Sequence, residues 1–179
     1  MGITLAGAGH SKIIMNEWFR RSVSACFDNR EIWDQLRQFG TPRWGGSYDH
    51  LLALGCDAVA TKRYDTCVPW QLFGTIAGVA SDARSMNREG DIKAPLTKPR
   101  VRQAVKDCIA GYIAARPSTA DEYHSLNACY LWHCGDKAGA RAALLDIKPE
   151  NRHAGVAEAM GLSYDQMLAD TEPAEKNTF

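Results

Sequence analysis

Helical periodicity runs through almost the whole chain and constrains its fold more than any other feature. Apolar residues recur three or four positions apart, whereas the strict alternation typical of half-buried strands is almost absent. The clearest stripes are Met15, Trp18, Phe19, Ser22 and Cys26; Ile32, Trp33, Leu36 and Phe39; and Val101, Val105, Cys108, Ile109 and Tyr112. The pattern predicts an all-α fold of about eight or nine short helices.

The segment PWQLFGTIAGVA, residues 69–80, is apolar on nearly all sides, which predicts a central helix buried by several neighbours. Gly74 and Gly78 lie four positions apart on it, so we expect another helix to pack closely against that face. Residues 84–99 are polar and contain a glycine and two prolines. They are predicted to form the longest loop and a candidate seam within a single domain, residues 1–179.

Two capping boxes are predicted at helix starts, each a Ser or Thr followed three residues later by Glu or Gln. The first pairs Thr119 with Glu122, after Pro117 and Ser118 break the preceding helix. The second pairs Ser163 with Gln166. In both, side-chain oxygens would accept hydrogen bonds from backbone amides that the helix leaves free.

Residues 119–147 predict a helical hairpin with a tight turn at Gly135. Its small and apolar residues have a spacing similar to that of a tetratricopeptide repeat. They are Ala128, Leu131, Gly135, Ala140, Leu144 and Ile147. The sequence therefore favours stacked helical hairpins, either tetratricopeptide-like or as an irregular bundle, and such stacks usually bind partners without chemistry of their own.

Charge and cysteine content exclude several classes of protein. Lys plus Arg and Asp plus Glu both count 21, so the basic excess usual in nucleic-acid-binding proteins is missing. The six cysteines occur in a chain long enough to fold without disulfides, which predicts free and mostly buried thiols. With no leader pattern and no apolar run of membrane length, we expect a cytoplasmic protein.

Two short motifs are weak candidates for a cofactor or metal site. Gly7 and Gly9 look like the start of a dinucleotide-binding loop, but Lys12 occupies the third glycine position and no strand-helix alternation follows. Around HSLNACYLWHC, Cys129 and His133 form an i, i+4 pair, and two ligands alone hold no structural metal. We therefore expect neither a metal nor a cofactor.

Residues 152–170 have the spacing of a helix-turn-helix, with residues 163–170 in the place of the recognition helix. That helix offers Asp165 and Asp170, followed by Glu172, where phosphates and bases call for cationic or amide side chains. Since an acidic face repels phosphate, an ordinary helical hairpin is favoured, and DNA binding is kept as an alternative.

The stretch TPRWGGSYDH, residues 41–50, can be interpreted either as a binding loop or as a sharp corner between two helices. Ser47 is placed to cap the next helix, while Gly45 and Gly46 permit a positive φ or a close backbone approach. Trp44 could fill the gap between the two helices, and Arg43 could stack on a ring or contact a helix C-terminus. An architectural role accounts for every residue and is favoured over a ligand-binding role.

Together with NEWFRRSV and YLWHCGDKAGARAALLDI, the segment RWGGSYDHLLALG resembles a bacterial family, domain of unknown function 4034, over about residues 15–148. The resemblance implies an all-helical protein with no established catalytic residues. Comparable small helical proteins serve as immunity partners of secreted antibacterial toxins, which is an analogy at the level of the fold.

These features favour a non-enzymatic protein that binds another protein, with a bacterial toxin as one candidate partner. The contact surface would be a concave face between hairpins, or the acidic C-terminal helices meeting a basic partner. The candidate partner-binding residues are Arg43, Trp44, Ser47, Asp49, Asp165, Asp170 and Glu172.

A small hydrolase or transferase is the alternative from a different class. It would use His50 or His124 together with Asp49, Asp121 or Cys129. A pocket that holds one of these histidines beside its partner would favour this alternative, and exposed histidines without partners would argue against it.

Overall fold

The structure, a computed structural model, describes residues 12–171, and its regular elements there are ten α-helices and four short 3₁₀-helices. The α-helices are α2 (Lys12–Ala25), α3 (Arg30–Phe39), α4 (Tyr48–Ala60), α5 (Gln71–Ser85), α6 (Lys93–Leu96), α7 (Pro99–Ala115), α8 (Ala120–His133), α9 (Lys137–Leu145), α10 (Ala154–Ala159) and α11 (Tyr164–Ala169). The all-α prediction is confirmed. The Gly7–Gly9 motif, Glu172 and the rest of the C-terminal tail lie outside the described residues.

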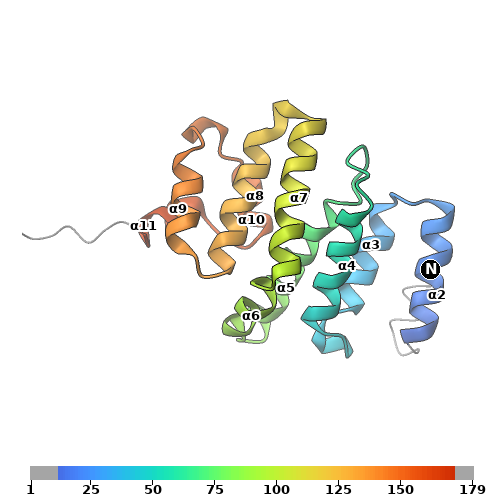
Figure 1. The fold of residues 1–179 in the computed structure, drawn as a ribbon. Coiled ribbons are helices and arrows are strands. Elements are labelled where there is room, and N and C mark those ends of the chain that lie inside the picture. The colour runs from blue at the N-terminus through green and yellow to red at the C-terminus, as the bar shows by residue number, and fades with distance from the viewer. Residues whose placement is uncertain (1–11, 172–179) are drawn as a thin grey trace, which may run out of the picture.

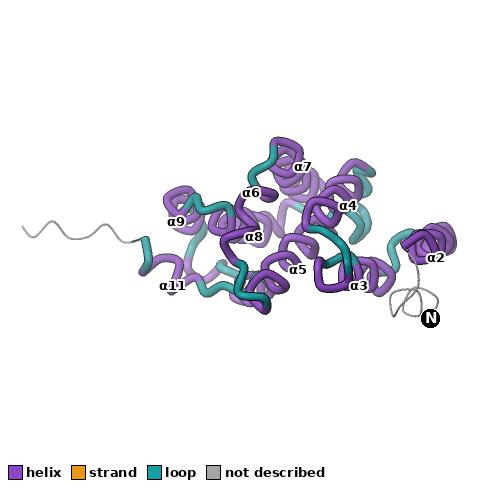
Figure 2. Tube along the Cα trace, turned by 90° about the horizontal axis from the view of Figure 1, so that it is seen from below, coloured by secondary structure: helices purple, strands orange, loops and turns teal. Residues whose placement is uncertain are grey.

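The helices stack side by side from α2 at one end to α9 and α11 at the other (Figure 1). Helix α4 packs against α5 and α7, α7 packs against α8, and α8 packs most extensively against α9. Seen from below, α4 and α7 lie along one side of the stack, and α3 and α5 lie along the other (Figure 2). The predicted hairpin over residues 119–147 is confirmed, with Gly135 in the turn at a φ of 79°.

Helix α5 is the central helix that its composition predicts. Leu72 and Ile76 are fully buried, and Gly55 of α4 approaches so closely that a Cβ there would lie 3.0 Å from the Cα of Leu72. The prediction that another helix packs closely against the face of Gly74 and Gly78 is wrong. The atoms nearest to a Cβ on Gly74 would be those of the Arg37 guanidinium, and a Cβ on Gly78 would meet no atom within 4 Å.

The prediction of a long loop over residues 84–99 is wrong. Helix α5 continues to Ser85, and the 3₁₀-helix η2 (Glu89–Ile92) leads directly into α6. Ile92 and Leu96 are 5% and 0% exposed and anchor this segment in the main core cluster. The glycine and the two prolines suggested a loop, but Ile92 and Leu96, four positions apart, fix the backbone of this segment against the core.

Neither predicted capping box forms. The hydroxyl of Thr119 donates to the carbonyl oxygen of Arg116 (2.9 Å), because a 3₁₀-helix, η3 (Pro117–Thr119), runs straight into α8. Ser163 begins α11 without a side-chain capping bond. By contrast, Ser47 caps α4 as expected and accepts from the amide of His50 (3.2 Å).

The helical corner predicted within residues 152–170 is present, with Gly161 at a φ of 70°. Helices α10 and α11 have six residues each, and Tyr164 and Met167 of α11 are buried in the core. Two neighbouring helices hold the corner in place. Arg84 donates to the carbonyl oxygen of Gly161 (2.9 Å), and the Nε2 atom of His133 lies 3.1 Å from that of Met160.

Lowering the pH is expected to weaken this corner through His133. Burial lowers the pKa of His133, the hydrogen bond to Met160 opposes that shift, and the charge of Arg84 lowers the pKa further. Because the folded-state pKa lies below the unfolded value of about 6.5, the stabilising effect is complete above pH 6.5 and is lost as the pH falls toward the lowered pKa. Urea unfolding between about pH 7.5 and pH 5 measures this loss.

His133→Gln is the matched control, since glutamine can donate the same bond without titrating. Its free energy of unfolding should fall less between the two pH values than that of the wild type. An equal fall in both proteins would assign the pH dependence to other groups.

Candidate functional site

The RWGGS turn is closed by its own backbone. The amide of Gly46 donates to the carbonyl oxygen of Thr41 (2.9 Å), and Gly45 has a φ of 78°. A Cβ on Gly46 would lie 1.7 Å from the carbonyl oxygen of Gly40. The two glycines therefore serve the two purposes predicted for them, positive φ at Gly45 and close backbone approach at Gly46.

Arg43 connects this turn to α5 through a buried carboxylate. Its Nε donates to Asp82 (2.8 Å), whose side chain is 5% exposed, and its Nη2 donates to the hydroxyl of Ser85. Tyr48 donates to the second oxygen of Asp82 (2.9 Å). Burial and these interactions with Asp82 raise the pKa of Tyr48 to about 12, so its hydroxyl remains protonated and keeps donating.

The partner of Arg43 was not anticipated from the sequence, which pointed to an aromatic ring or a helix C-terminus. The available signal was Asp82 itself, the one carboxylate in the otherwise uncharged run from Gln71 to Ala83. Such a residue on a central helix must find a donor, because burying an unpaired charge is costly.

Trp44 lies at the edge of the turn and does not fill the gap between the helices. Its side chain is 48% exposed, and its ring meets that of Phe39 edge-on, with centroids 5.5 Å apart. An edge-to-face pair of this kind fixes the orientation of the indole ring without burying it. One face of the tryptophan is therefore available to another molecule.

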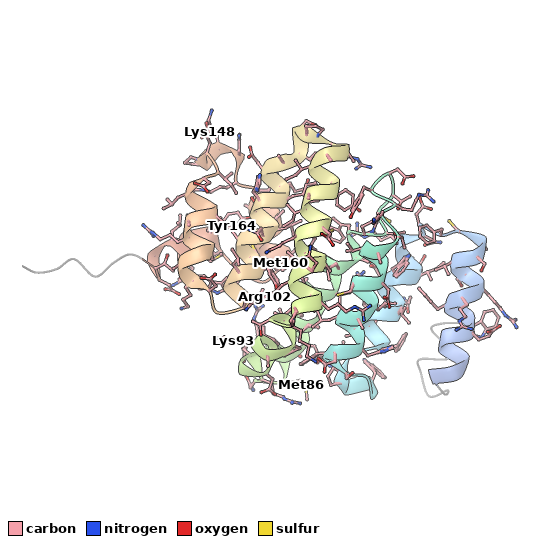
Figure 3. All side chains as sticks on the ribbon, viewed as in Figure 1. Met86, Lys93, Arg102, Lys148, Met160 and Tyr164 are labelled. Atoms are coloured by element: carbon pink, nitrogen blue, oxygen red, sulfur yellow. The ribbon has the colours of Figure 1, made fainter. Side chains whose placement is uncertain are left out.

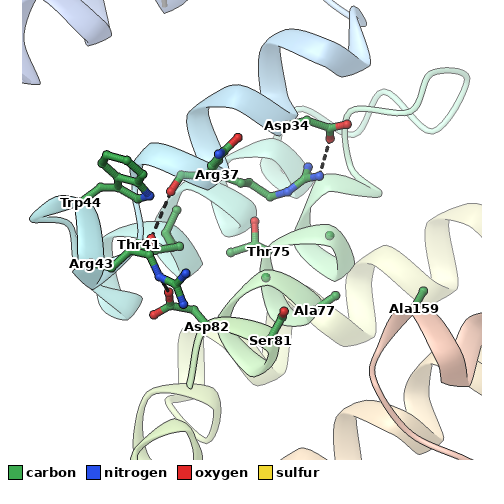
Figure 4. A pocket seen from close by; sticks show the side chains of 14 residues that line it. Asp34, Arg37, Thr41, Arg43, Trp44, Thr75, Ala77, Ser81, Asp82 and Ala159 are labelled. Carbon is green, nitrogen blue, oxygen red and sulfur yellow. Dashed lines mark hydrogen bonds and ion pairs between the residues drawn. The ribbon is translucent and has the colours of Figure 1, made fainter. Parts of the chain in front are cut away.

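Beside Trp44, a cavity of about 500 Å³ opens along α5 (Figure 4). A second cavity of about 520 Å³ shares Ala77 and Ala159 with it and extends to Trp70 and Val156. Together they form a groove along α5, between α3 on one side and α10 on the other. Its floor along the first cavity, which we call the α5 groove floor, consists of Gly74, Ala77, Gly78 and Ser81.

The α3 wall of this groove carries an ion pair. Arg37 donates to the side chains of Asp34 and Gln71, with Asp34 drawn in Figure 4. Burial lowers the pKa of Arg37, and the charge of Asp34 opposes that shift. With Arg43 paired to Asp82 at the other end, both guanidinium groups of the first cavity are engaged inside the chain. The groove thus combines an uncharged floor with walls whose charges are balanced.

The remaining predicted partner-binding residues are not brought together. Asp49 forms an exposed ion pair with Lys98 (2.7 Å) on the first turn of α4. Asp165 and Asp170 lie on and just after α11, at the other end of the stack (Figure 1), and Asp170 accepts from Gln166. The predicted set therefore divides into the turn beside the groove and a separate acidic end.

The arrangement expected of a hydrolase or transferase is not found in residues 12–171. His50 and His124 are exposed, and neither imidazole makes a hydrogen bond there. Cys129 is fully buried, and burial raises its pKa to about 12, which disfavours a nucleophilic thiolate. Within the same residues, no three or more His, Cys, Asp or Glu side chains are grouped so as to hold a metal ion.

All six cysteines are free, and four of them are buried, as the composition predicts. Comparisons with protein-family models, with curated proteins and with solved structures find no match for this chain. The resemblance drawn from the RWGGS turn receives no support from them and stays a prediction. Among the described helices, none has the length and apolar character that crossing a membrane requires.

Proposed function

We propose that this chain is a non-enzymatic helical scaffold that binds another protein, and that a segment of the partner lies in the α5 groove. The observation that carries the proposal is the open floor at Gly78, where a Cβ would meet nothing within 4 Å. A partner backbone or side chain could therefore approach α5 closely. Stacked helical hairpins commonly use such concave surfaces for binding.

Trp44 supports the same location. It is a large aromatic residue, half exposed, held at the rim of the groove by Phe39. Tryptophan is enriched among the few residues that dominate binding energies at protein interfaces. Because Arg43 and Ser47 are already engaged by Asp82 and the amide of His50, we assign them the role of holding Trp44 in place.

The partner class suggested by the analogy with small helical immunity proteins is a bacterial toxin, neutralised in the cytoplasm by one-to-one binding. This narrower proposal adds an observable consequence. The partner captured by the tagged chain should lose its toxicity when the two proteins are produced together. Variants that no longer bind should no longer protect the cell.

Filling the groove tests the proposal. Gly78→Phe places a ring in the open space, whereas Gly90→Phe makes the same change on the 3₁₀-helix η2, where a Cβ also meets nothing within 4 Å. After capture from the native host and identification by mass spectrometry, the purified partner is titrated against each variant. We expect Gly78→Phe to weaken binding by at least about tenfold and Gly90→Phe to leave it unchanged, since the ring replaces the partner in the groove.

Trp44→Ala provides the second variant. Loss of an interface tryptophan of this kind costs about 2 kcal/mol or more of binding, roughly thirtyfold in affinity. The same substitution should lower the free energy of unfolding by only about 1 kcal/mol, because it removes one edge-to-face contact with Phe39. Full binding by folded Gly78→Phe, or capture of no stoichiometric partner, would refute the proposal.

A further inference from the structure

We propose that a second surface of this protein, separate from the α5 groove, binds an acidic segment of a partner protein. This surface, the basic strip, consists of Lys93, Lys98, Arg102 and Lys106 on and beside α6 and α7. Lys98, Arg102 and Lys106 recur every four positions, so they follow one face of α7. All four side chains are exposed, and residues 93–106 contain no carboxylate.

Three cations of the strip have no acidic partner within the described part of the chain. Lys98 pairs with Asp49, whereas Lys93, Arg102 and Lys106 form no ion pair or side-chain hydrogen bond there. Arg100 lies on another side of α7, two positions before Arg102, and pairs with Asp57 of α4. The first turn of α7 contains no carboxylate, so the positive end of that 17-residue helix adds to the same potential.

Part of this charge has a role inside the fold. The amine of Lys93 lies beside Gly135, at the C-terminal end of α8, and Figure 3 shows Lys93 and Arg102 below that helix. Cations at a helix C-terminus are stabilising, typically by 0.3–1 kcal/mol on a surface. Lys106 lies two turns further along α7 than Lys98, away from the C-terminal end of α8. Stabilisation of that helix end therefore does not explain all the positive charge of the strip.

The charge of the C-terminal helices is opposite to that of the strip. Residues 117–171 contain eight carboxylates and four cations, a net charge of −4, although the whole chain is neutral. An acidic segment would therefore be attracted to α6 and α7 and repelled by the C-terminal helices. Complementarity of this kind selects and orients a partner more than it adds affinity.

The size of the strip favours a short acidic peptide over a nucleic acid or a membrane. Proteins that bind duplex DNA neutralise about 6–10 phosphates, whereas here three cations are unpaired. Lys98 and Lys106 are eight positions apart, which corresponds to about 12 Å along the helix. The exposed residues beside these cations on α7, Gln103 and Asp107, are polar, so no large apolar side chain is present there to enter a bilayer.

The test uses a fluorescein-labelled peptide of eight glutamates, with fluorescence anisotropy at about 0.02 M and about 0.15 M salt. The strip variant carries Lys93→Glu, Arg102→Glu and Lys106→Glu. The control variant carries Arg20→Glu, Arg116→Glu and Lys148→Glu, which reverses the charge of three other exposed cations that form no ion pair within residues 12–171. Both variants have the same net charge, and circular dichroism establishes that both are folded.

We expect the strip variant to bind the peptide at least about tenfold more weakly than the wild type and the control to bind within about twofold. Equal losses in both variants, or no binding by the wild type at low salt, would overturn the proposal. So would tighter binding of a short DNA duplex to the strip, or concentration-dependent self-association that only the strip variant abolishes. Because Gly78→Phe leaves the strip unchanged, it should bind the peptide normally whether or not the groove binds a protein.

Discussion

Gly46→Ala is expected to lower the free energy of unfolding by about 3 kcal/mol or more, the largest effect of any single methyl group added at a described glycine. The new Cβ would lie 1.7 Å from the carbonyl oxygen of Gly40 and 2.3 Å from its carbonyl carbon. Both are backbone atoms, so no rotation of a side chain relieves the clash. The turn would have to open, and the bond from the amide of Gly46 to Thr41 would be lost.

Gly78→Ala is the matched control and should have the opposite sign. Gly78 is in the interior of α5, its φ is not positive, and a Cβ there meets no atom within 4 Å. Alanine in a helix interior is favoured over glycine by about 0.5–1 kcal/mol. Urea unfolding of both variants measures the difference. A Gly46→Ala protein as stable as the wild type would show that the turn does not need this close approach.

Asp82→Ala is expected to lower the free energy of unfolding by about 2–3 kcal/mol. The carboxylate accepts from Tyr48 and from Arg43, and its removal leaves the buried hydroxyl of Tyr48 without an acceptor. The side chain of Arg43 is 43% exposed, so water can replace the hydrogen bond that its guanidinium loses. Most of the loss in the free energy of unfolding therefore comes from the unpaired hydroxyl of Tyr48. The exposed neighbour Ser81, changed to alanine, should lie within about 0.5 kcal/mol of the wild type.

A double-mutant cycle separates the two donors. If the unpaired hydroxyl accounts for the cost, Tyr48→Phe should destabilise the wild type but add little to Asp82→Ala, giving a coupling of about 1 kcal/mol or more. Strictly additive effects of the two substitutions would contradict the hydrogen bond between them.

Much of the fold could be predicted from local pattern. The apolar stripes around Trp33 and Val105 are helices, Ser47 caps α4, and Gly135 turns the chain between α8 and α9. These features depend on residues within one or two turns of one another, so their physical cause is present in a short stretch of sequence. The predictions that failed depended on neighbours distant in sequence or on competition from adjacent structure. Burial of Ile92 and Leu96 secures a segment that resembles a loop, and η3 diverts the hydroxyl of Thr119 from its cap.

The candidate site shows the same division. Sequence alone singled out Trp44 and the two glycines beside it, because paired glycines indicate a positive φ or a close backbone approach. Only the tertiary structure paired Arg43 with Asp82, 39 residues away, and left the face of α5 at Gly78 open between α3 and α10. Helical periodicity determines which face of a helix is apolar, but the crossing of three helices determines whether that face is covered. That crossing depends on the side-chain volumes of residues that lie far apart in the chain.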